Sequence, residues 1–154
     1  LQHGSVPFAL ELVQGPDEKK NAWVRRTAAG VMLTHEIKSI MNSDLYRSCF
    51  RLLLQFGYGK PGVRVFNYWQ PEQPVRVEGA DAATLVVSKP GRAMMVVCDY
   101  GNGGNLTMSI DTKTLGLKSD FTAEDAETGE KLPITDRKVA FPLKKHDFRI
   151  IALE

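Results

Sequence analysis

The chain has 154 residues, which suits one domain or a small domain joined to part of another. Its net charge is +2, and neither half is strongly basic: residues 1–60 carry 8 Lys and Arg against 5 Asp and Glu, and residues 61–154 carry 12 against 13. A nucleic-acid partner is therefore not expected. No apolar run approaches the roughly 18 residues that span a membrane, so a membrane partner is not expected either.

Residues 8–57 have the pattern of alternating strand and helix. The nearly continuous apolar run 8–13 predicts a strand buried between layers. A helix with Asn21 as its cap follows, residues 34–39 fit either more helix or a short strand, and a second helix ends at Gly57. The predicted apolar stripes are Val24, Ala28, Val31 and Met32 in the first helix, and Leu45, Cys49, Leu52, Leu53 and Phe56 in the second. This order indicates βα units, which form parallel sheets covered by helices.

Beyond residue 61 the pattern changes to short strands separated by Gly, Pro, Asn and Asp. Strands are predicted at 63–69, 75–77, 84–88, 93–100, 106–110, 121–125, 138–141 and 148–153. Residues 89–92 and 101–105 have the composition of hairpin turns, and 101–105 is expected to be an exposed hairpin tip. Many short strands at this spacing are typical of an antiparallel β-sandwich, with no helix longer than about two turns.

The two cysteines lie in different kinds of element. Cys49 falls in a helical pattern and Cys98 in a strand pattern, and their spacing gives no disulfide framework. Two buried free thiols are the expected state. No metal-binding spacing and no cofactor motif is present, so no cofactor is predicted.

Several segments resemble the C-terminal region of bacterial glycoside-hydrolase-like proteins. They are the strand Val63–Trp69, Leu85–Lys89 with Pro90–Gly91, Met94–Cys98, the closing Lys145–Arg149, and the earlier stretch Ala28–Glu36. In those proteins a (β/α)₈ barrel is followed by a C-terminal β-sandwich. The resemblance implies a mixed fold in which residues 1–60 are the last βα units of a barrel and residues 61–154 form the sandwich domain.

The resemblance also implies a function. The chain would be the C-terminal part of a carbohydrate-active protein, with the sandwich buttressing a catalytic barrel and with a carbohydrate as substrate. The alternative is a non-catalytic β-sandwich module with a structural or sugar-binding role. Because residues 1–60 would be only the last units of a barrel, their apolar residues are expected to contact the rest of that barrel or another chain. These residues are Phe8, Leu10, Leu12, Val31 and Leu33. Cellular location stays open, with a secreted or periplasmic bacterial location as one hypothesis.

Glycoside hydrolysis uses a pair of carboxylates, and two are candidates here. Glu11 lies near the carboxyl end of the first predicted strand, where barrel active sites gather. Its alternative role is a strand-rim carboxylate bound to an Arg or to backbone. Glu36 is the second catalytic candidate, and His35 beside it is a candidate to bind a sugar hydroxyl. The alternative is that His35 and Glu36 are a hydrogen-bonded structural pair.

Tyr68 and Trp69 are candidate substrate-binding residues. Adjacent aromatic rings can stack on the apolar face of a pyranose ring. The alternative is that both rings bury against a neighbouring domain, as large aromatic side chains do at domain junctions. No residue is proposed as a metal ligand, because the His35-Glu36 pair lacks a second His at the spacing of a zinc protease helix.

Overall fold

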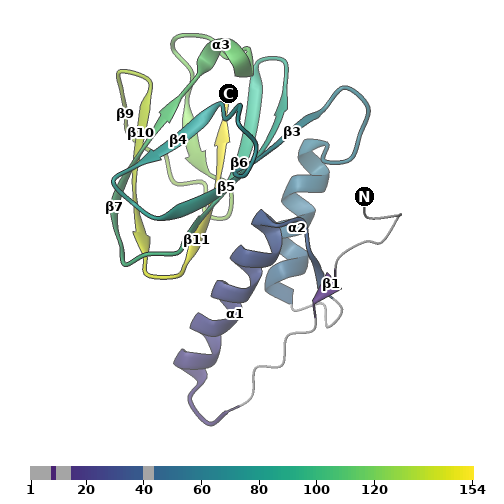
Figure 1. Ribbon diagram of the computed structural model, residues 1–154, viewed down its shortest axis with the longest axis vertical. Helices are drawn as coiled ribbons and strands as arrows, with labels where there is room; N and C mark the ends of the chain where they lie inside the picture. The colour runs from purple at the N-terminus through teal and green to yellow at the C-terminus, as the bar shows by residue number, and fades with distance from the viewer. Residues whose placement is uncertain (1–7, 10–14, 40–43) are drawn as a thin grey trace.

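The computed structural model describes residues 8–9, 15–39 and 44–154 (Figure 1). The described helices are α1 (Glu18–Thr34), α2 (Asp44–Phe56) and the short α3 (Thr112–Leu115). The strands are β1 (Phe8–Ala9), β2 (Lys38–Ser39), β3 (Arg64–Asn67), β4 (Val75–Glu78), β5 (Ala82–Lys89), β6 (Arg92–Asp99), β7 (Gly103–Ile110), β8 (Ala123–Asp125), β9 (Ile134–Thr135), β10 (Lys138–Lys144) and β11 (Phe148–Leu153). None of the described helices is long and apolar enough to cross a bilayer.

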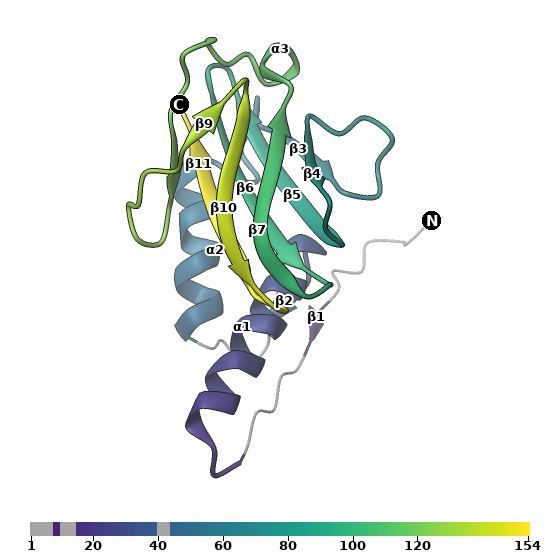
Figure 2. The same ribbon diagram turned by 90° about the vertical axis from the view of Figure 1, so that its left-hand side faces the viewer.

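Two antiparallel sheets dominate the fold and pack face to face. One has the strand order β3-β5-β6-β11-β8 and the other the order β4-β7-β10-β9. Figure 2 shows the four-stranded sheet in front of the five-stranded one. The prediction of a mixed fold with an antiparallel sandwich is therefore confirmed in its second part, and α3, at 4 residues, stays within the predicted limit on helix length.

The core between the sheets follows from residue alternation along the strands. On β7, Leu106, Met108 and Ile110 are buried while Asn105, Thr107 and Ser109 point outward. Successive side chains in a strand point to opposite faces, so this alternation fixes which face meets the other sheet. On β6 the whole run Ala93–Asp99 is buried, and alternate residues belong to two different apolar clusters.

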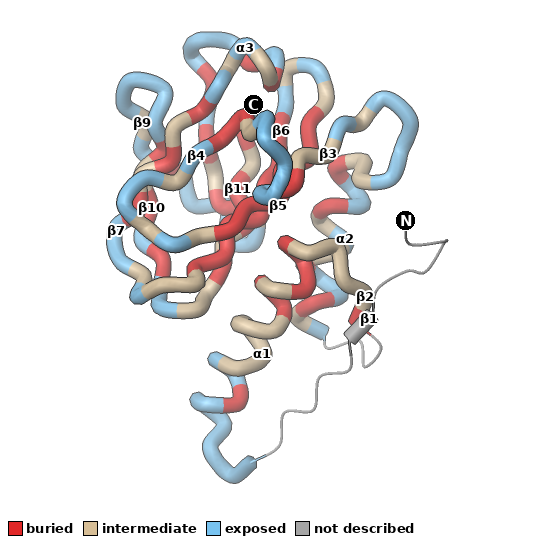
Figure 3. The backbone as a smooth tube through the Cα atoms, viewed as in Figure 1, coloured by how far each residue is buried: buried red, intermediate tan, exposed pale blue. Residues whose placement is uncertain are grey.

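The helices cover the outer face of the five-stranded sheet and form a second core. Contacts run from α1 to β5, β6 and β11, and α2 packs beside α1. This core joins Ala29, Met32 and Leu33 of α1 to Cys49 and Leu53 of α2 and to strand residues that include Leu85, Val96, Cys98, Phe148 and Ile150. Figure 3 shows the contrast between the buried centre of the molecule and the exposed first turn of α1. The elements on either side of residue 60 therefore share one apolar layer.

Gly30 marks the closest approach of α1 to the sheet. A Cβ atom built there would lie 2.9 Å from Cys98 Sγ and 3.0 Å from Phe148 Cβ. Cys98 and Phe148 are themselves fully buried and have no room to move. Thr34, one turn further along, donates its hydroxyl hydrogen to the Gly30 carbonyl. Only a residue without a side chain lets the helix backbone lie this close to β6 and β11.

The start of the first helix differs from the prediction. Asp17, not Asn21, is the N-cap, and its side chain accepts a hydrogen bond from the backbone N–H of Lys20. Glu18 in the first turn adds a favourable charge at the helix N-terminus. Asn21 lies inside the helix and donates from Nδ2 to the Gly15 carbonyl. Because Asp and Asn are both good caps, the sequence alone favoured the wrong one.

The prediction of a hairpin at residues 101–105 is also wrong, although Asn102, Gly104 and Asn105 are exposed as expected. β7 begins at Gly103, so the connection after β6 is shorter than predicted, and β6 and β7 belong to different sheets. Gly103 pairs with Lys144, and a Cβ there would clash with the backbone of residues 143–145. The segment is a crossing between sheets and not a hairpin tip. The hairpin at 89–92 is confirmed, since Lys89 pairs with Arg92 across Pro90–Gly91.

In the first block, β1 precedes α1 in the chain and β2 follows it, and the two strands pair in parallel. The optional strand in residues 34–39 is therefore present, although only at Lys38–Ser39. No barrel is seen in the described residues. Leu33 is buried in the chain's own second core and Val31 is packed against it, so the expectation that Leu33 contacts another protein is wrong. The side chains of Phe8, Leu10 and Leu12 lie outside the described residues.

We predict that Gly30→Ala destabilises the protein. Replacing Gly by Ala inside a helix gains about 1 kcal/mol from helix propensity. Overpacking a filled core costs about 1–3 kcal/mol, and Cys98 and Phe148 cannot yield, so the cost should exceed the gain. Urea denaturation should show a lower midpoint. Ala22→Gly on the exposed side of α1 is the control for propensity alone, and a Gly30→Ala variant as stable as the wild type would contradict the close approach.

We predict that both thiols are unreactive in the folded protein. Burial, with the nearby Glu127 carboxylate, raises the pKa of Cys49 to about 12, and burial raises the pKa of Cys98 to about 12 as well. Only the thiolate attacks a disulfide reagent, and at pH 8 about one thiol in ten thousand would be ionised. Titration with an aromatic disulfide at pH 8 should release no thiolate until urea unfolds the chain, after which two equivalents react. Rapid reaction of either residue in the native protein would contradict this arrangement.

Candidate functional site

Four of the five residues proposed from the sequence come together at the C-terminal end of α1. His35 caps the helix, Glu36 follows it, and Tyr68 and Trp69 come from the turn after β3. The fifth residue, Glu11, lies outside the described residues. We call the cluster of His35, Tyr68 and Trp69 the aromatic site.

His35 fixes the position of Tyr68 through a hydrogen bond of 2.8 Å between Nε2 and the Tyr68 hydroxyl. The other ring nitrogen, Nδ1, lies 2.9 Å from the Val31 carbonyl oxygen, which can only accept. Nδ1 therefore carries the hydrogen, and in the neutral ring Nε2 accepts from the Tyr68 hydroxyl. The hydroxyl hydrogen of Tyr68 thus points at the helix end, and its ring is held on an exposed turn.

Tyr68 and Trp69 remain open to solvent. Their exposed fractions are 40% and 52%, so the alternative that both rings are buried at a junction does not apply within this chain. The Trp69 ring lies 6.1 Å from the His35 ring at an interplanar angle of 29°, and Tyr68 meets both rings edge-on at 5.3 and 5.0 Å. β3 ends at Asn67, two residues before the predicted end, and the Gln70 N–H closes a turn on the Asn67 carbonyl.

Glu36 uses both of its carboxylate oxygens inside the protein. The Tyr58 hydroxyl donates to Oε1 at 2.5 Å, and Asn67 Nδ2 donates to Oε2 at 3.0 Å. Burial and this hydrogen bond raise the pKa of Tyr58, so its hydroxyl stays a donor at neutral pH. Glu36 also has a φ of 57°, a left-handed conformation that is unfavourable for a residue with a side chain. The carboxylate therefore ties the end of α1 to Tyr58 and to the end of β3.

Sequence reasoning missed the amide groups behind the aromatic site. Asn67 Nδ2 is oriented by Glu36, and Gln73 Nε2 donates to the Asn67 carbonyl, so each side-chain oxygen is placed as an acceptor. Asn67 Oδ1 and Gln73 Oε1 are enclosed and have no donor among the described residues. Buried acceptors of this kind carry a cost that a water or hydroxyl donor removes. The only signal in the sequence was the position of Asn67 directly before Tyr68-Trp69.

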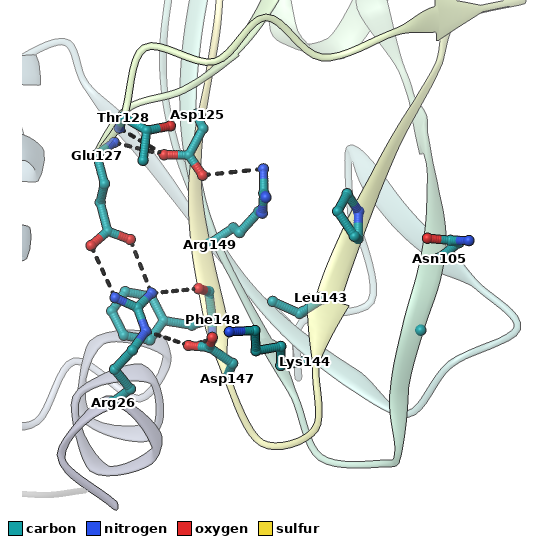
Figure 4. A pocket seen from close by; sticks show the side chains of 12 residues that line it. Arg26, Asn105, Asp125, Glu127, Thr128, Leu143, Lys144, Asp147, Phe148 and Arg149 are labelled. Atoms are coloured by element: carbon teal, nitrogen blue, oxygen red, sulfur yellow. Dashed lines mark hydrogen bonds and ion pairs between the residues drawn. The ribbon is translucent and has the colours of Figure 1, made fainter. Parts of the chain in front are cut away.

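The chain also has an open groove of about 640 Å³ at the sandwich edge formed by β8 and β9, opposite the edge formed by β3 and β4 (Figure 4). It lies where both sheets have short edge strands, since β8 pairs only with Ile151–Leu153 of β11 and β9 only with Lys138–Val139 of β10. Pro142 lies on this edge of β10 and offers no backbone donor, which discourages pairing with another strand.

The two arginines of this groove are paired with carboxylates. Arg26 of α1 contacts Asp147 at 2.5 Å and Glu127 at 3.2 Å, and it also donates to the Phe148 carbonyl. Burial lowers the pKa of Arg26, and its hydrogen bonds to Glu127 and Asp147 raise it by more, so it remains charged. Arg149 bridges Asp125 and Glu130 in the same way. The Arg26 pairs join α1 to the sandwich and the Arg149 pairs lie within the sandwich, and we assign both a structural role.

The described residues contain no group of three or more His, Cys, Asp or Glu side chains that could hold a metal ion. At the aromatic site the available chemistry is an exposed pair of aromatic rings, one oriented imidazole and several amides. This arrangement suits recognition of a polar ligand that has an apolar face. A carboxylate with both oxygens already bound, such as Glu36, is poorly placed for proton transfer without rearrangement.

Comparison with known proteins gives little guidance. No protein-family model matches the chain, and no curated protein sequence matches it. Among solved structures, the wild-type GH27 β-L-arabinopyranosidase from Geobacillus stearothermophilus is similar over 52% of this chain and 19% of its own, with 19% identity and a TM-score of 0.40. A variant of the same enzyme in complex with arabinose is similar over 48% of this chain and 17% of its own, with 20% identity and a TM-score of 0.39. The match spans about half of this chain but less than a fifth of each arabinopyranosidase chain, and TM-scores this low settle neither family nor activity.

We predict that Glu36→Ala lowers stability while Glu36→Gln lowers it less. Alanine leaves the Tyr58 hydroxyl and Asn67 Nδ2 without a partner, and unpaired buried donors cost about 1–3 kcal/mol. Glutamine keeps one acceptor oxygen and its shape. Thermal unfolding of the two variants should rank them in that order. Equal stability of Glu36→Ala and the wild type would show that the carboxylate does not hold the end of α1.

Proposed function

We propose that this chain is the C-terminal part of a carbohydrate-active, glycoside-hydrolase-like protein, in which the sandwich and its two helices support a catalytic barrel. We further propose that the aromatic site binds sugar. The observation that carries the second proposal is the exposure of Tyr68 and Trp69 on a turn held in place by His35. Large aromatic rings that are exposed to water carry an unfavourable hydration free energy. Stacking of a pyranose face on the rings removes water from them and offsets it.

The barrel part of the proposal is supported by the order β1, α1, β2, α2 with β1 and β2 parallel. Two parallel strands form a stable sheet only as part of a larger one with both faces covered. The preceding strands and helices of a longer protein would supply that cover. The resemblance of residues 28–36 and 63–69 to the barrel end and sandwich start of such proteins agrees with this arrangement.

The two carboxylates proposed for catalysis differ in their place in the chain relative to the strands. Glu36 comes before β2, whereas Glu11 comes after β1. In a (β/α)₈ barrel the catalytic groups lie at the carboxyl ends of the strands. Glu11 is therefore the better candidate for a catalytic role. The aromatic site, whose His35 comes just before β2 in the chain, would be an accessory sugar-binding surface away from the catalytic cleft.

The second candidate function is a non-catalytic module that binds sugar or only supports a neighbour. The position of His35 just before β2 favours this second candidate as well. A sugar site near the amino end of a barrel strand lies away from the catalytic end and needs no catalytic partner. The two candidates differ in what Glu11 does in a protein that contains the rest of the barrel. A sugar-binding module would use Trp69 in the same way, whereas a module that only supports a neighbour would bind no sugar there.

We predict that the 154-residue chain binds oligosaccharides through Trp69. The sequence has two Trp residues, so Trp23→Phe leaves Trp69 as the sole indole fluorophore. Titration of this variant with a panel of neutral oligosaccharides should shift the Trp69 emission, because a stacked sugar excludes water from the ring. Trp69→Ala should weaken binding by about tenfold or more, the equivalent of 1.4 kcal/mol.

The controls for this experiment use the other aromatic residues. Trp23 is also exposed but hydrogen-bonds the Lys145 carbonyl far from His35, so Trp23→Phe should leave affinity unchanged in calorimetry. Tyr68→Phe removes only the hydroxyl that meets His35 and should bind with intermediate affinity. Equal affinity of Trp69→Ala and the wild type, or no binding of any sugar, would refute the sugar-binding proposal.

We predict that the isolated chain has no glycosidase activity and that Glu11 carries more of the chemistry than Glu36. In a longer protein that contains the remaining barrel, Glu11→Gln should lower turnover by about 10²–10⁴-fold, the usual contribution of general acid–base assistance. Glu36→Gln should keep most of the turnover. Hydrolysis by the 154-residue chain alone, or full activity of Glu11→Gln, would contradict the barrel proposal.

A further inference from the structure

A second groove, of about 420 Å³, has Tyr68 of the aromatic site in its lining. It lies between the edge strand β4 and the first part of β5, below the turn that contains Pro71 and Gln73. β3 pairs with β5 only at Leu85–Ser88, so the edge of β5 at Ala82–Thr84 is left without a strand partner. The groove is the opening that this short pairing leaves at the corner of the sandwich.

Arg76 lines this groove and is exposed. Its guanidinium has no ion pair or hydrogen bond among the described residues, whereas Arg26, Arg92 and Arg149 are each paired. The nearest carboxylate along β4, that of Glu78, is bound to Lys138. The groove that Tyr68 lines therefore also offers an uncompensated positive charge. Guanidinium groups bind carboxylates and sulfates with two parallel hydrogen bonds, so this charge favours an anionic ligand.

The other lining residues suit a sugar. Gln73 lines the groove, and its Oε1, which is enclosed and lacks a donor among the described residues, would accept from a ligand hydroxyl once the side chain turns outward. Val75 and Val77 supply apolar wall on the β4 side. An apolar wall, an amide side chain and an unpaired cation match a saccharide that carries a negative charge. A purely apolar ligand would leave Gln73 and Arg76 unused.

We propose that the groove from Tyr68 to Arg76 binds an acidic saccharide, with the aromatic site holding one sugar unit and Arg76 pairing with a carboxylate or sulfate on another. This inference rests on the sugar-binding function proposed for Trp69 and adds the chemical class of the ligand. The charge on the sugar is what Arg76 selects. Glu72, exposed in the same turn, does not line the groove and takes no part.

Two matched pairs of oligosaccharides test the proposal in the 154-residue chain. Oligogalacturonates are compared with their methyl esters, and oligosaccharides of a sulfated galactan are compared with the desulfated form. The charged member of at least one pair should bind about tenfold more tightly by calorimetry, as expected for a charge-assisted hydrogen bond. Its affinity should fall as salt rises, while that of the neutral member should not. The pair with the larger difference distinguishes carboxylate from sulfate.

Arg76→Gln should abolish the preference for the charged member and leave the neutral affinity unchanged. Arg51→Gln on α2, which is also exposed, is the matched control and should keep the preference, as should Glu72→Gln. Thermal unfolding confirms that each variant is folded. A preference that survives Arg76→Gln, or no preference in the wild type, would overturn this inference while leaving sugar binding at Trp69 intact. Failure of every sugar, charged or neutral, to bind would overturn both proposals.

Discussion

The structure depends on one constraint, which is that the five-stranded sheet is apolar on both faces. On β5 and β6 alternate residues enter two different cores, one shared with the four-stranded sheet and one shared with the helices. A sheet with two apolar faces cannot leave either face in water, because each buried Leu, Val or Met side chain is worth about 1.5–3 kcal/mol. The helices of the first block are therefore required by the sandwich, and Gly30 is the residue that lets α1 lie close enough to cover it.

The aromatic site is a consequence of this packing. His35 and Glu36 come from the end of α1, while Asn67 and Tyr68 come from the end of β3. These two segments are far apart in the chain, and the packing of α1 on the sheet brings them together. Once the helix is seated, Glu36 binds Tyr58 and Asn67 and His35 binds the Tyr68 hydroxyl. The positions of the exposed rings are thus set by contacts in the interior. A surface that is held this firmly loses little conformational entropy when it binds a ligand.

The sequence predicted local features well because they depend on nearby residues. Eight strands of the sandwich and both long helices follow from periodicity, and the turn at Pro90–Gly91 follows from its composition. It did not predict that β6 and β7 lie in different sheets, since a Gly-rich connection is compatible with a hairpin or a crossing. It also missed the hydrogen bonds of Tyr58 and Asn67 to Glu36, because each depends on which strand or helix ends beside it. His35-Glu36 and Tyr68-Trp69 were predicted as two separate pairs, and only the fold brings the pairs together.

Native-state hydrogen exchange tests most directly whether the helices and the sandwich form one unit. If α1 is the necessary cover of the five-stranded sheet, the slowest amides of α1 and those of β5, β6 and β11 should exchange only by the same global unfolding. Their opening free energies should agree with each other and shift together in urea with the same slope. If the amides of α1 exchange at a much lower free energy while the strands stay protected, the helices are an independent attachment. The aromatic site would then not be held by the core.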